Sequence, residues 1–380
     1  MKSAKTIVVL TGGGLAPALN ATLYGVIKAA RQKGYKIYGS LYGWASLVQH
    51  GKIIDLTKLN IEAIKNRGGT FLRSSRTNPF KVTGGLINLR DNLKKYKIDA
   101  IIAIGGDDTL GAAAKLYQKE KINVIGLPKT VDNDLPATYF CPGFPSAAYY
   151  MAKLAAETRE DSAYALSRVY IIESYGAQSG WLTCAASLGG ADLVIPPEWQ
   201  FDLKKILALI KKRYAENGNF CLISLSKEAK IKGLKGFEDT QPDGYGHVRQ
   251  EFISLGLKKA IEEKLGLAAK IILPMNYFQS GLPIDLDRKM GYQLGQKSIE
   301  LASKGKFGRS VMIDLKSEKF IPKEVPINSF LKGIKRMPAG WFDKNAMQPN
   351  GKYLNYLKTL VGNFNFLDDK YSRLQKRVNK

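Results

Sequence analysis

The sequence is poor in residues that carry several kinds of catalytic and structural chemistry. Among 380 residues there are only three cysteines and two histidines. The cysteines, Cys141, Cys184 and Cys221, lack the short spacing of metal ligands, which favours a reducing, cytoplasmic location over a disulfide-stabilised protein. With so few histidines, catalysis by a histidine base is not expected.

Long apolar runs are missing as well. No stretch of the sequence approaches the roughly 18 apolar residues that a membrane-spanning helix requires, so no membrane partner is expected. Hydrophobic residues nevertheless make up 45% of the chain and aromatic residues 10%. This composition is sufficient for two globular lobes with cores of their own.

Acidic residues are scarce relative to basic ones, 33 against 58, which gives a formal net charge of +25. A nucleic-acid-binding surface would explain such an excess. However, the lysines are spread along the chain and no nucleic-acid-binding motif accompanies them. We therefore expect a solvated basic surface that suits small anionic substrates, without a nucleic-acid partner.

What the sequence does contain is a strand, loop, helix and strand between residues 100 and 127. Ala100–Ile104 and Asn123–Leu127 have the composition of buried strands, and Leu110–Glu120 has that of a helix. A similar pattern opens the chain, where Thr6–Leu10 leads through a glycine turn into a helix at Ala16–Lys33. In a parallel sheet such loops open at one edge, where ligands bind in open α/β folds.

The loops after the two central strands carry groups that suit phosphate and metal. The first, GGDDT at 105–109, combines glycines that allow close approach of a phosphate with two carboxylates, which indicates Mg²⁺ held against phosphate oxygens. The second, PKTVDND at 128–134, joins a lysine to carboxylates able to take a hydroxyl proton. Phosphoryl transfer to an alcohol needs this combination of metal, cation and oriented acceptor.

The same motifs carry a family resemblance. GGDDT followed by PKTVDND, with TGGGLAPALNA near the N-terminus, NRGGTFLRSSR at Asn66–Arg76 and ESYGAQSGWL at Glu173–Leu182, resembles the phosphofructokinase family. That family phosphorylates fructose 6-phosphate at its 1-hydroxyl in glycolysis. IPPE at Ile195–Glu198 and DLDRKMG at Asp285–Gly291 extend the resemblance over roughly residues 5 to 300.

The resemblance implies an α/β fold of two Rossmann-like three-layer lobes with mostly parallel sheets. A donor lobe would comprise residues 1–144 plus about 278–330, and an acceptor lobe residues 145–277. Residues 331–380 contain no family motif and are interpreted as a C-terminal helical extension with a basic tail. Mg²⁺ dependence and a homodimer or homotetramer are also implied.

Individual roles follow from position in the motifs. Asp132 would be the base that takes the acceptor's proton, with Lys129 and Thr130 as further catalytic residues and Asp107 as the Mg²⁺ ligand. The donor-binding residues would be Gly13, Arg76, Gly106, Asp108 and Thr109. The acceptor-binding residues would be Asp134, Arg168, Tyr175, Gly176, Glu198 and Lys270, with Arg168 often reaching across a subunit interface in the family.

Two positions bear on the phosphoryl donor. ATP-using members of the family usually have glycine at the positions of Asp108 and Lys129, whereas pyrophosphate-using relatives have aspartate and lysine. The Asp108 carboxylate occupies space that an α-phosphate and its nucleoside would need. The Lys129 ammonium neutralises a leaving phosphate that has no nucleotide body to anchor it. The sequence therefore most resembles the pyrophosphate-dependent members, with ATP as the alternative donor.

The sugar-phosphate site departs from the family pattern. The family's Met-Gly-Arg is Tyr175-Gly176-Ala177 here, and no arginine occurs in Met275–Gly281, where the family has a glutamine followed by an arginine. Each lost charge-assisted hydrogen bond is worth roughly 1.5–3 kcal/mol, so weaker fructose 6-phosphate binding is expected.

Three interpretations of this divergent site stay open. The first is a pyrophosphate-dependent phosphofructokinase with a rearranged sugar-phosphate clamp. The second is the same chemistry on another sugar, a polyol or a nucleoside. The third, a non-catalytic subunit, is disfavoured by the intact carboxylates and Lys129.

Overall fold

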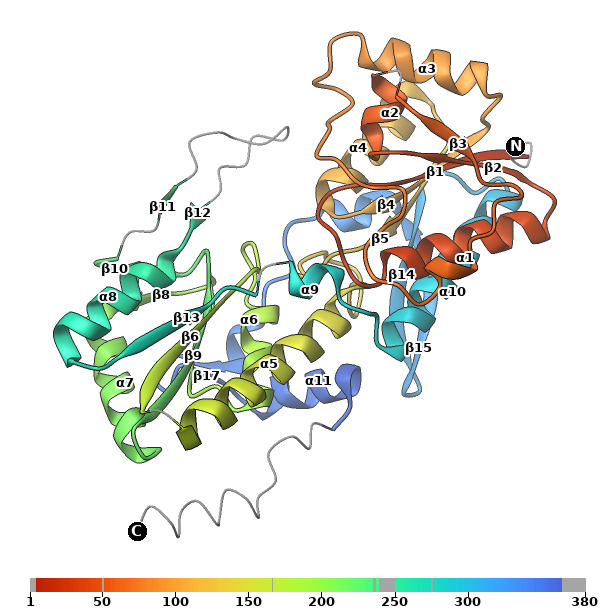
Figure 1. The fold of residues 1–380 in the computed structure, drawn as a ribbon. Helices are drawn as coiled ribbons and strands as arrows, with labels where there is room; N and C mark the ends of the chain where they lie inside the picture. Colours follow the sequence, from red (N-terminus) through yellow and green to blue (C-terminus); the bar gives the residue numbers. More distant parts are fainter. Residues whose placement is uncertain are drawn as a thin grey trace.

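Two β-sheets, one in each lobe of the molecule, organise the chain in the computed structural model (Figure 1). The structure describes residues 5–49, 51–165, 167–234, 237–238, 250–274 and 276–363. None of the helices in these ranges has the length and apolar character needed to cross a bilayer.

The first sheet has seven strands among the described residues, in the order β15-β14-β5-β4-β1-β2-β3. They are β1 (Thr6–Thr11), β2 (Lys36–Ser40), β3 (Ile53–Asp55), β4 (Ala100–Gly105), β5 (Val124–Pro128), β14 (Arg309–Lys316) and β15 (Lys319–Pro326). The inner pairs are parallel, whereas β3 and β15 pair antiparallel at the two edges. The sheet therefore draws on segments nearly two hundred residues apart in the sequence.

Helices cover both faces of this sheet, and the alternation of side chains along β1 explains why. Ile7 and Val9 join the core formed with α1 (Leu19–Gln32) and α10 (Asp285–Ser303). Val8 and Leu10 join the core formed with α2 (Trp44–Val48), α3 (Gly85–Lys95) and α4 (Asp107–Glu120). A parallel strand buried on both faces needs a continuous apolar run, which is the pattern of the sequence here.

The second sheet has four parallel strands among the described residues, in the order β13-β6-β9-β7. They are β6 (Arg168–Ser174), β7 (Leu193–Ile195), β9 (Phe220–Ser226) and β13 (Ala269–Ile272). The helices of this lobe are α5 (Phe144–Ala165), α6 (Trp181–Ala185), α7 (Leu203–Glu216) and α8 (Ile253–Leu265). Helix α5 contacts β6 and β9, while α7 and α8 contact each other beside β9 and β13.

Short elements complete the described chain. Pairs of short strands are formed by β8 (Gln200–Asp202) with β10 (Lys230–Lys232), β11 (Phe237–Glu238) with β12 (Gln250–Glu251), and β16 (Phe342–Asp343) with β17 (Gln348–Pro349). Short helices are η1 (Glu62–Ile64), η2 (Ala186–Gly189), α9 (Tyr277–Ser280), η3 (Ile327–Leu331) and η4 (Ala339–Trp341).

The chain after β15 returns from the first sheet to the second lobe. It passes through η3, η4 and the β16–β17 hairpin to α11 (Gly351–Val361), which packs against α5 (Figure 1). The region expected to be a helical extension thus also contains a hairpin, whose two-residue strands are too short for a periodic signal. The expected basic tail, residues 364–380, lies outside the described residues.

The elements expected in the central unit are confirmed, with shifted ends. Helix α4 begins at Asp107 rather than Leu110, so both Asp107 and Asp108 lie in its first turn. A helix N-terminus is favourable for carboxylates because the partial positive charge of the helix dipole lies there. Antiparallel β15 was not expected. Exposed and half-buried residues alternate along most of it, as in an edge strand that has one face toward solvent.

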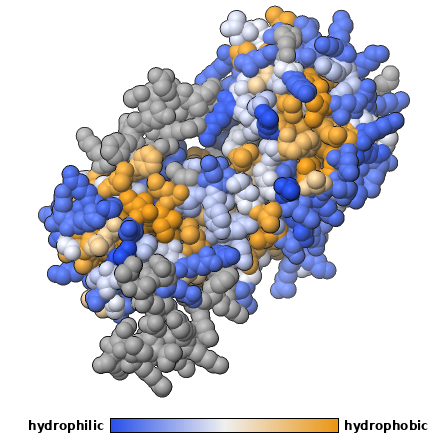
Figure 2. All heavy atoms as spheres, in the orientation of Figure 1, coloured by the Kyte–Doolittle hydropathy of each residue, from blue (hydrophilic) through white to orange (hydrophobic). Residues whose placement is uncertain are grey.

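Hydrophilic side chains line the outer edges of both lobes in Figure 2, while apolar residues form patches nearer the middle of each lobe. Large apolar side chains that are exposed, such as Ile87 and Leu282, occur on several separate elements.

The close packing of α1 on α10 generates a first prediction. A Cβ added at Gly25 would lie 2.2 Å from the Tyr292 carbonyl oxygen, which is backbone and cannot move aside without separating the helices. Gly25→Ala should therefore lower stability by about 1–3 kcal/mol, despite the better helix propensity of alanine. Thermal unfolding would measure this change. Gly340→Ala is the matched control, because nothing lies within 4 Å of its added Cβ; equal melting temperatures for both variants would contradict the packing argument.

Candidate active site

Three loops meet at the carboxyl edge of the first sheet, after β1, β4 and β5. The Gly12 amide donates to the Ile104 carbonyl at 2.9 Å, and the Lys129 amide donates to the Gly105 carbonyl at 3.0 Å. A Cβ on Gly12 or Gly105 would lie 2.4–2.5 Å from the Thr109 hydroxyl oxygen. Glycine at these positions thus lets the loops close over Thr109, whose side chain is buried.

Lys129 extends beneath the first glycine loop. Its ammonium donates a hydrogen bond to the Gly14 carbonyl and lies 3.7 Å from the position a Cβ of Gly13 would take. Burial lowers the pKa of Lys129 to about 8, although the charges of Asp132, Asp134 and Asp107 act to raise it. Arg76, which is exposed, is close enough to depress this pKa further. The cation and the three carboxylates therefore form one electrostatic cluster.

Asp132 is the carboxylate with the least satisfied environment in this cluster. Its Oδ1 is buried and has no hydrogen-bond partner among the described residues. The backbone around it is fixed, because the Asp132 amide donates to Thr130 Oγ1 at 3.0 Å and Ser179 Oγ donates to the Asp132 carbonyl at 2.9 Å. Burial raises the pKa of Asp132 to about 6, and Glu228 contributes to the rise. Such a carboxylate can accept a proton from a bound hydroxyl near neutral pH.

Asp134 shares this environment. Burial raises its pKa to about 7, and the charges of Asp132 and Asp107 raise it further. Gly106, the residue before α4, lies next to the second loop, because its Cβ would be 3.8 Å from the Lys129 carbonyl oxygen. The loop after β4, which contains Gly106, and the loop after β5, which contains Lys129 and the carboxylates, therefore lie next to each other.

The mutual repulsion of Asp107, Asp132 and Asp134 fits a divalent cation, which would lower the cost of holding all three ionised. In the described parts of the chain, no three carboxylate, cysteine or histidine side chains lie close enough to hold a metal by themselves. Mg²⁺ is commonly bound by one or two carboxylates together with substrate phosphates and waters. The donor set therefore fits magnesium that binds together with a phosphate ligand, and exposed Asp107 is the accessible protein ligand.

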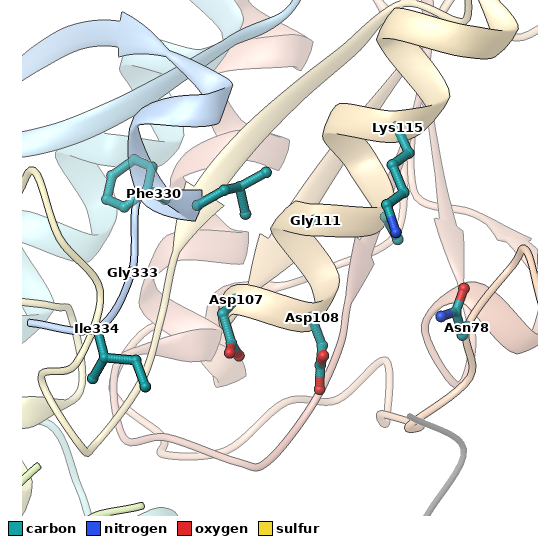
Figure 3. Close-up of a pocket in the computed structure, with 10 residues that line it drawn as sticks. Asn78, Asp107, Asp108, Gly111, Lys115, Phe330, Gly333 and Ile334 are labelled. Atoms are coloured by element: carbon teal, nitrogen blue, oxygen red, sulfur yellow. The ribbon is translucent and has the colours of Figure 1, made fainter. Parts of the chain in front are cut away.

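A cavity of about 360 Å³ lies beside these carboxylates. It is lined by Asn78, Asp107, Asp108, Gly111, Ala112, Lys115, Phe330, Leu331, Gly333 and Ile334. Figure 3 shows Asp107 and Asp108 side by side at the start of α4, with Lys115 two turns further along and Phe330 and Ile334 on the opposite wall. Phosphate groups that reach the glycine loops would thus have a polar cavity next to them.

The predicted acceptor residues Glu198, Tyr175 and Gly176 lie on the side of the second lobe that meets Asp132. Glu198 Oε1 accepts hydrogen bonds from the Gly180 amide at 2.7 Å and the Met337 amide at 3.1 Å. Its Oε2 is buried without a partner among the described residues, and burial raises the pKa of Glu198. The Ser179 side chain, which contacts Asp132, also donates to the Gly176 carbonyl at 3.1 Å. Each lobe therefore contributes one buried carboxylate oxygen without a partner among the described residues, at Asp132 and at Glu198.

Two further predicted acceptor residues, Arg168 and Lys270, do not lie beside Tyr175, Gly176 and Glu198 of the same chain. Arg168 begins β6, whereas Tyr175 follows the end of that strand, roughly 20 Å away at the usual rise per residue. Lys270 pairs in register with Tyr170, near the same far end of the sheet. The amino and carboxyl ends of parallel strands lie at opposite edges of a sheet, so these two residues lie away from Tyr175 and Gly176 of their own chain.

Residues outside the recognised motifs also reach the site. The half-buried carboxyl of Glu228, whose pKa burial raises to about 7, lies near Asp132 and pairs with Lys227 at 3.4 Å. Lys335 donates to Asn133 Oδ1 at 3.0 Å, and its ammonium lies 5.3 Å from the centre of the Trp181 ring. No periodicity or glycine turn marks these residues, so nothing in the sequence pattern pointed to them.

Comparison with known proteins finds a family and several relatives that this chain resembles. The family described as Phosphofructokinase matches residues 6–302. A pyrophosphate–fructose 6-phosphate 1-phosphotransferase of Dictyoglomus thermophilum is 34% identical over 323 residues, 84% of this chain and 92% of the relative. ATP-dependent 6-phosphofructokinase 3 of Streptomyces coelicolor is 33% identical over 307 residues, 79% of this chain and 88% of the relative.

Solved structures of similar fold include a pyrophosphate-dependent phosphofructokinase from Marinobacter aquaeolei, with a TM-score of 0.82 and 23% identity over 96% of this chain and 94% of that one. Another, from Nitrosospira multiformis, has a TM-score of 0.84 and 23% identity over 94% of this chain and 92% of that one. These matches confirm the two-lobed α/β fold expected from the motifs.

The raised pKa of Asp132 predicts a pH-dependent stability difference. Its folded-state pKa of about 6 lies above the ordinary value of 3.8, so ionisation costs stability as the pH rises through this window. Asp132→Asn should therefore match wild type in melting temperature near pH 4 and exceed it above pH 6, in buffer without magnesium or phosphate. Asp91→Asn on the exposed face of α3 is the matched control. A stability difference that does not change with pH would contradict the assigned environment of Asp132.

Proposed function

The chain belongs to the phosphofructokinase family, and we propose that it transfers a phosphoryl group from pyrophosphate to the 1-hydroxyl of fructose 6-phosphate. One observation carries the proposal. Asp132, whose side-chain Oδ1 is unpartnered, lies beside Lys129 on one lobe, and its backbone carbonyl accepts a hydrogen bond from Ser179 in the loop after β6 on the other. A base at such a junction can take a proton from an acceptor while a neighbouring cation binds the donor.

The donor side would hold pyrophosphate between the glycine loops and the start of α4. Backbone amides and the helix N-terminus favour phosphate there, and Lys129 supplies a full positive charge. Asp107 would be the protein ligand of Mg²⁺, which when bound supplies positive charge to the phosphate oxygens. Gly13, Arg76, Gly106, Asp108 and Thr109 complete the proposed donor site, with Thr109 acting from beneath the loops.

The acceptor side would present the sugar to Asp132. This carboxylate would take the hydroxyl proton, while Thr130 and Asp134 orient the reacting group. The free Oε2 of Glu198 is positioned to accept a hydrogen bond from a sugar hydroxyl. Because the chemistry is direct transfer, most of the rate would come from positioning and charge neutralisation.

Pyrophosphate is preferred over ATP on the identity of Asp108 and Lys129. The similar relatives include both pyrophosphate-dependent and ATP-dependent enzymes, so overall similarity does not separate the donors. Asp108 lines the cavity beside the phosphate loops, where its carboxylate would repel an α-phosphate and take the room of a nucleoside. Lys129 would hold the phosphate that leaves.

The wider setting follows from the family. We propose a Mg²⁺-dependent glycolytic enzyme of the cytoplasm that forms a homodimer or homotetramer. Its donor lobe would be residues 1–144 plus about 278–330, which supply the first sheet, and its acceptor lobe residues 145–277, which supply the second. Arg168 and Lys270 would then serve a neighbouring subunit, since they lie far from their own chain's Asp132.

Purified protein with Mg²⁺ and pyrophosphate should convert fructose 6-phosphate to fructose 1,6-bisphosphate. Asp132→Asn should reduce turnover by about 10²- to 10⁴-fold, the usual contribution of a positioned base, while it retains pyrophosphate binding. Parallel assays would use sedoheptulose 7-phosphate, fructose, inositol and nucleosides as acceptors. Turnover of only an unphosphorylated acceptor would show that the proposed sugar phosphate is wrong, and near-normal activity of Asp132→Asn would show that the base is wrong.

The donor assignment makes a separate prediction. Asp108→Gly combined with Lys129→Gly should increase the ratio of kcat/KM for ATP to kcat/KM for pyrophosphate by about tenfold or more, because it opens the cavity and removes one charge-assisted contact. Lys119→Gly is the control, since it puts a glycine in the exposed last turn of α4 away from the cavity. A donor ratio that is the same in the double variant and wild type would remove the steric argument.

A further inference from the structure

A short segment after β15, residues 333–337, lies across the acceptor side of the site and is termed the C-terminal strap. The Lys335 amide donates to the Asp134 carbonyl at 2.6 Å, and the Trp181 indole donates to the Lys335 carbonyl at 2.8 Å. The Met337 amide donates to Glu198 Oε1 at 3.1 Å. The strap therefore binds both the loop after β5 and the acceptor residues of the second lobe.

The Lys335 side chain fixes the strap from the inside. Its ammonium donates to Asn133 Oδ1 and to the carbonyls of Thr138 and Tyr139, each at 3.0 Å. These three acceptors use all three donors of a lysine ammonium, so Lys335 has no hydrogen available for a ligand. Its role is to hold the backbone on one side of Arg336, while Met337 holds it on the other.

Arg336 itself is directed toward the acceptor loop. It is exposed, and its Nη2 donates to Gln178 Oε1 at 3.0 Å, the one hydrogen bond that its guanidinium makes among the described residues. Its charge also acts on Glu198, whose pKa it lowers. Because a guanidinium has five N–H donors, most of those of Arg336 stay available to a ligand.

The surrounding charges make this cation important. Asp132, Asp134, Glu198 and Glu228 all gather on this side. Lys227 is paired with Glu228 at 3.4 Å, and Lys335 is occupied by carbonyl groups. Ala177, beside Gln178, contributes no charge to the loop. Of these three cations Arg336 is the exposed one, and its guanidinium keeps most of its donors for an anionic group on the acceptor.

We propose that Arg336 binds the phosphate group of the acceptor and thereby selects a sugar phosphate over an unphosphorylated sugar. The inference rests on the proposed function and deepens it. Gln178, which Arg336 contacts, directly precedes Ser179, which contacts Asp132. One acceptor molecule can therefore span the two sites, with its hydroxyl at Asp132 and its phosphate at Arg336. Guanidinium is well matched to this task because it binds phosphate bidentately.

The test compares fructose 6-phosphate with fructose as acceptors in steady-state assays with pyrophosphate. Arg336→Ala should raise the KM for fructose 6-phosphate about 10- to 100-fold, the effect of losing charge-assisted bonds, with a smaller change in kcat. The kcat/KM for fructose should be the same in Arg336→Ala as in wild type. Arg336→Lys should recover part of the loss, because it restores charge without the bidentate geometry. Arg90→Ala, which removes the same charge from a surface pair with Glu120 on the first lobe, is the matched control.

Calorimetric titration with fructose 6-phosphate in the absence of donor supplies a second readout of the same contact. Weaker binding by Arg336→Ala, but not by Arg90→Ala, supports the inference. An active enzyme whose KM and affinity for fructose 6-phosphate are unaffected by Arg336→Ala overturns the inference and leaves the proposed function standing. A wild-type enzyme that phosphorylates only unphosphorylated acceptors overturns the proposed acceptor and the inference together.

Discussion

The buried charge cluster at the edge of the first sheet is the constraint on which the site depends. One lysine, Lys129, lies against Asp132, Asp134 and Asp107, so negative charge exceeds positive charge in a place with little water. Burial disfavours the charged forms of Lys129, Asp132 and Asp134, whereas Asp107 at the edge of the cluster is exposed. A phosphate ligand accompanied by a divalent cation would change this balance, so ligand binding is expected to depend on the electrostatics of these groups.

The scaffold holds that cluster through backbone close approach. Thr109 fills the space under the glycines of two loops, and α1 packs against α10 where Gly25 has no side chain. In both places the backbone of a glycine lies closer to a neighbouring residue than it could if the glycine carried a Cβ. The loops after β1, β4 and β5 therefore converge, and the carboxylates and Lys129 must share a small volume even though their charges are unfavourable when unpaired.

The C-terminal strap connects this cluster to the second lobe. It is held by Asp134 on one side and by Trp181 and Glu198 on the other, so residues beyond the shared motifs help to shape the acceptor side. A loop that lacks an arginine at Ala177 can in this way be served by a guanidinium that arrives from a segment more than a hundred and fifty residues later. Divergence in one motif thus need not mean loss of the chemistry.

The sequence by itself determined the two α/β lobes, the order of the central strands and helices, and the phosphate and carboxylate loops at the sheet edge. These features arise from local patterns: apolar runs as at Ala100–Gly105, glycine turns, and the carboxylates of the GGDDT loop at 105–109. Only the tertiary structure decided that Thr109 is buried, that Arg168 and Lys270 lie at the far end of their sheet, and that Glu228, Lys335 and Arg336 reach the site. Contacts between distant segments depend on the three-dimensional path of the chain, and no periodicity in the sequence encodes that path.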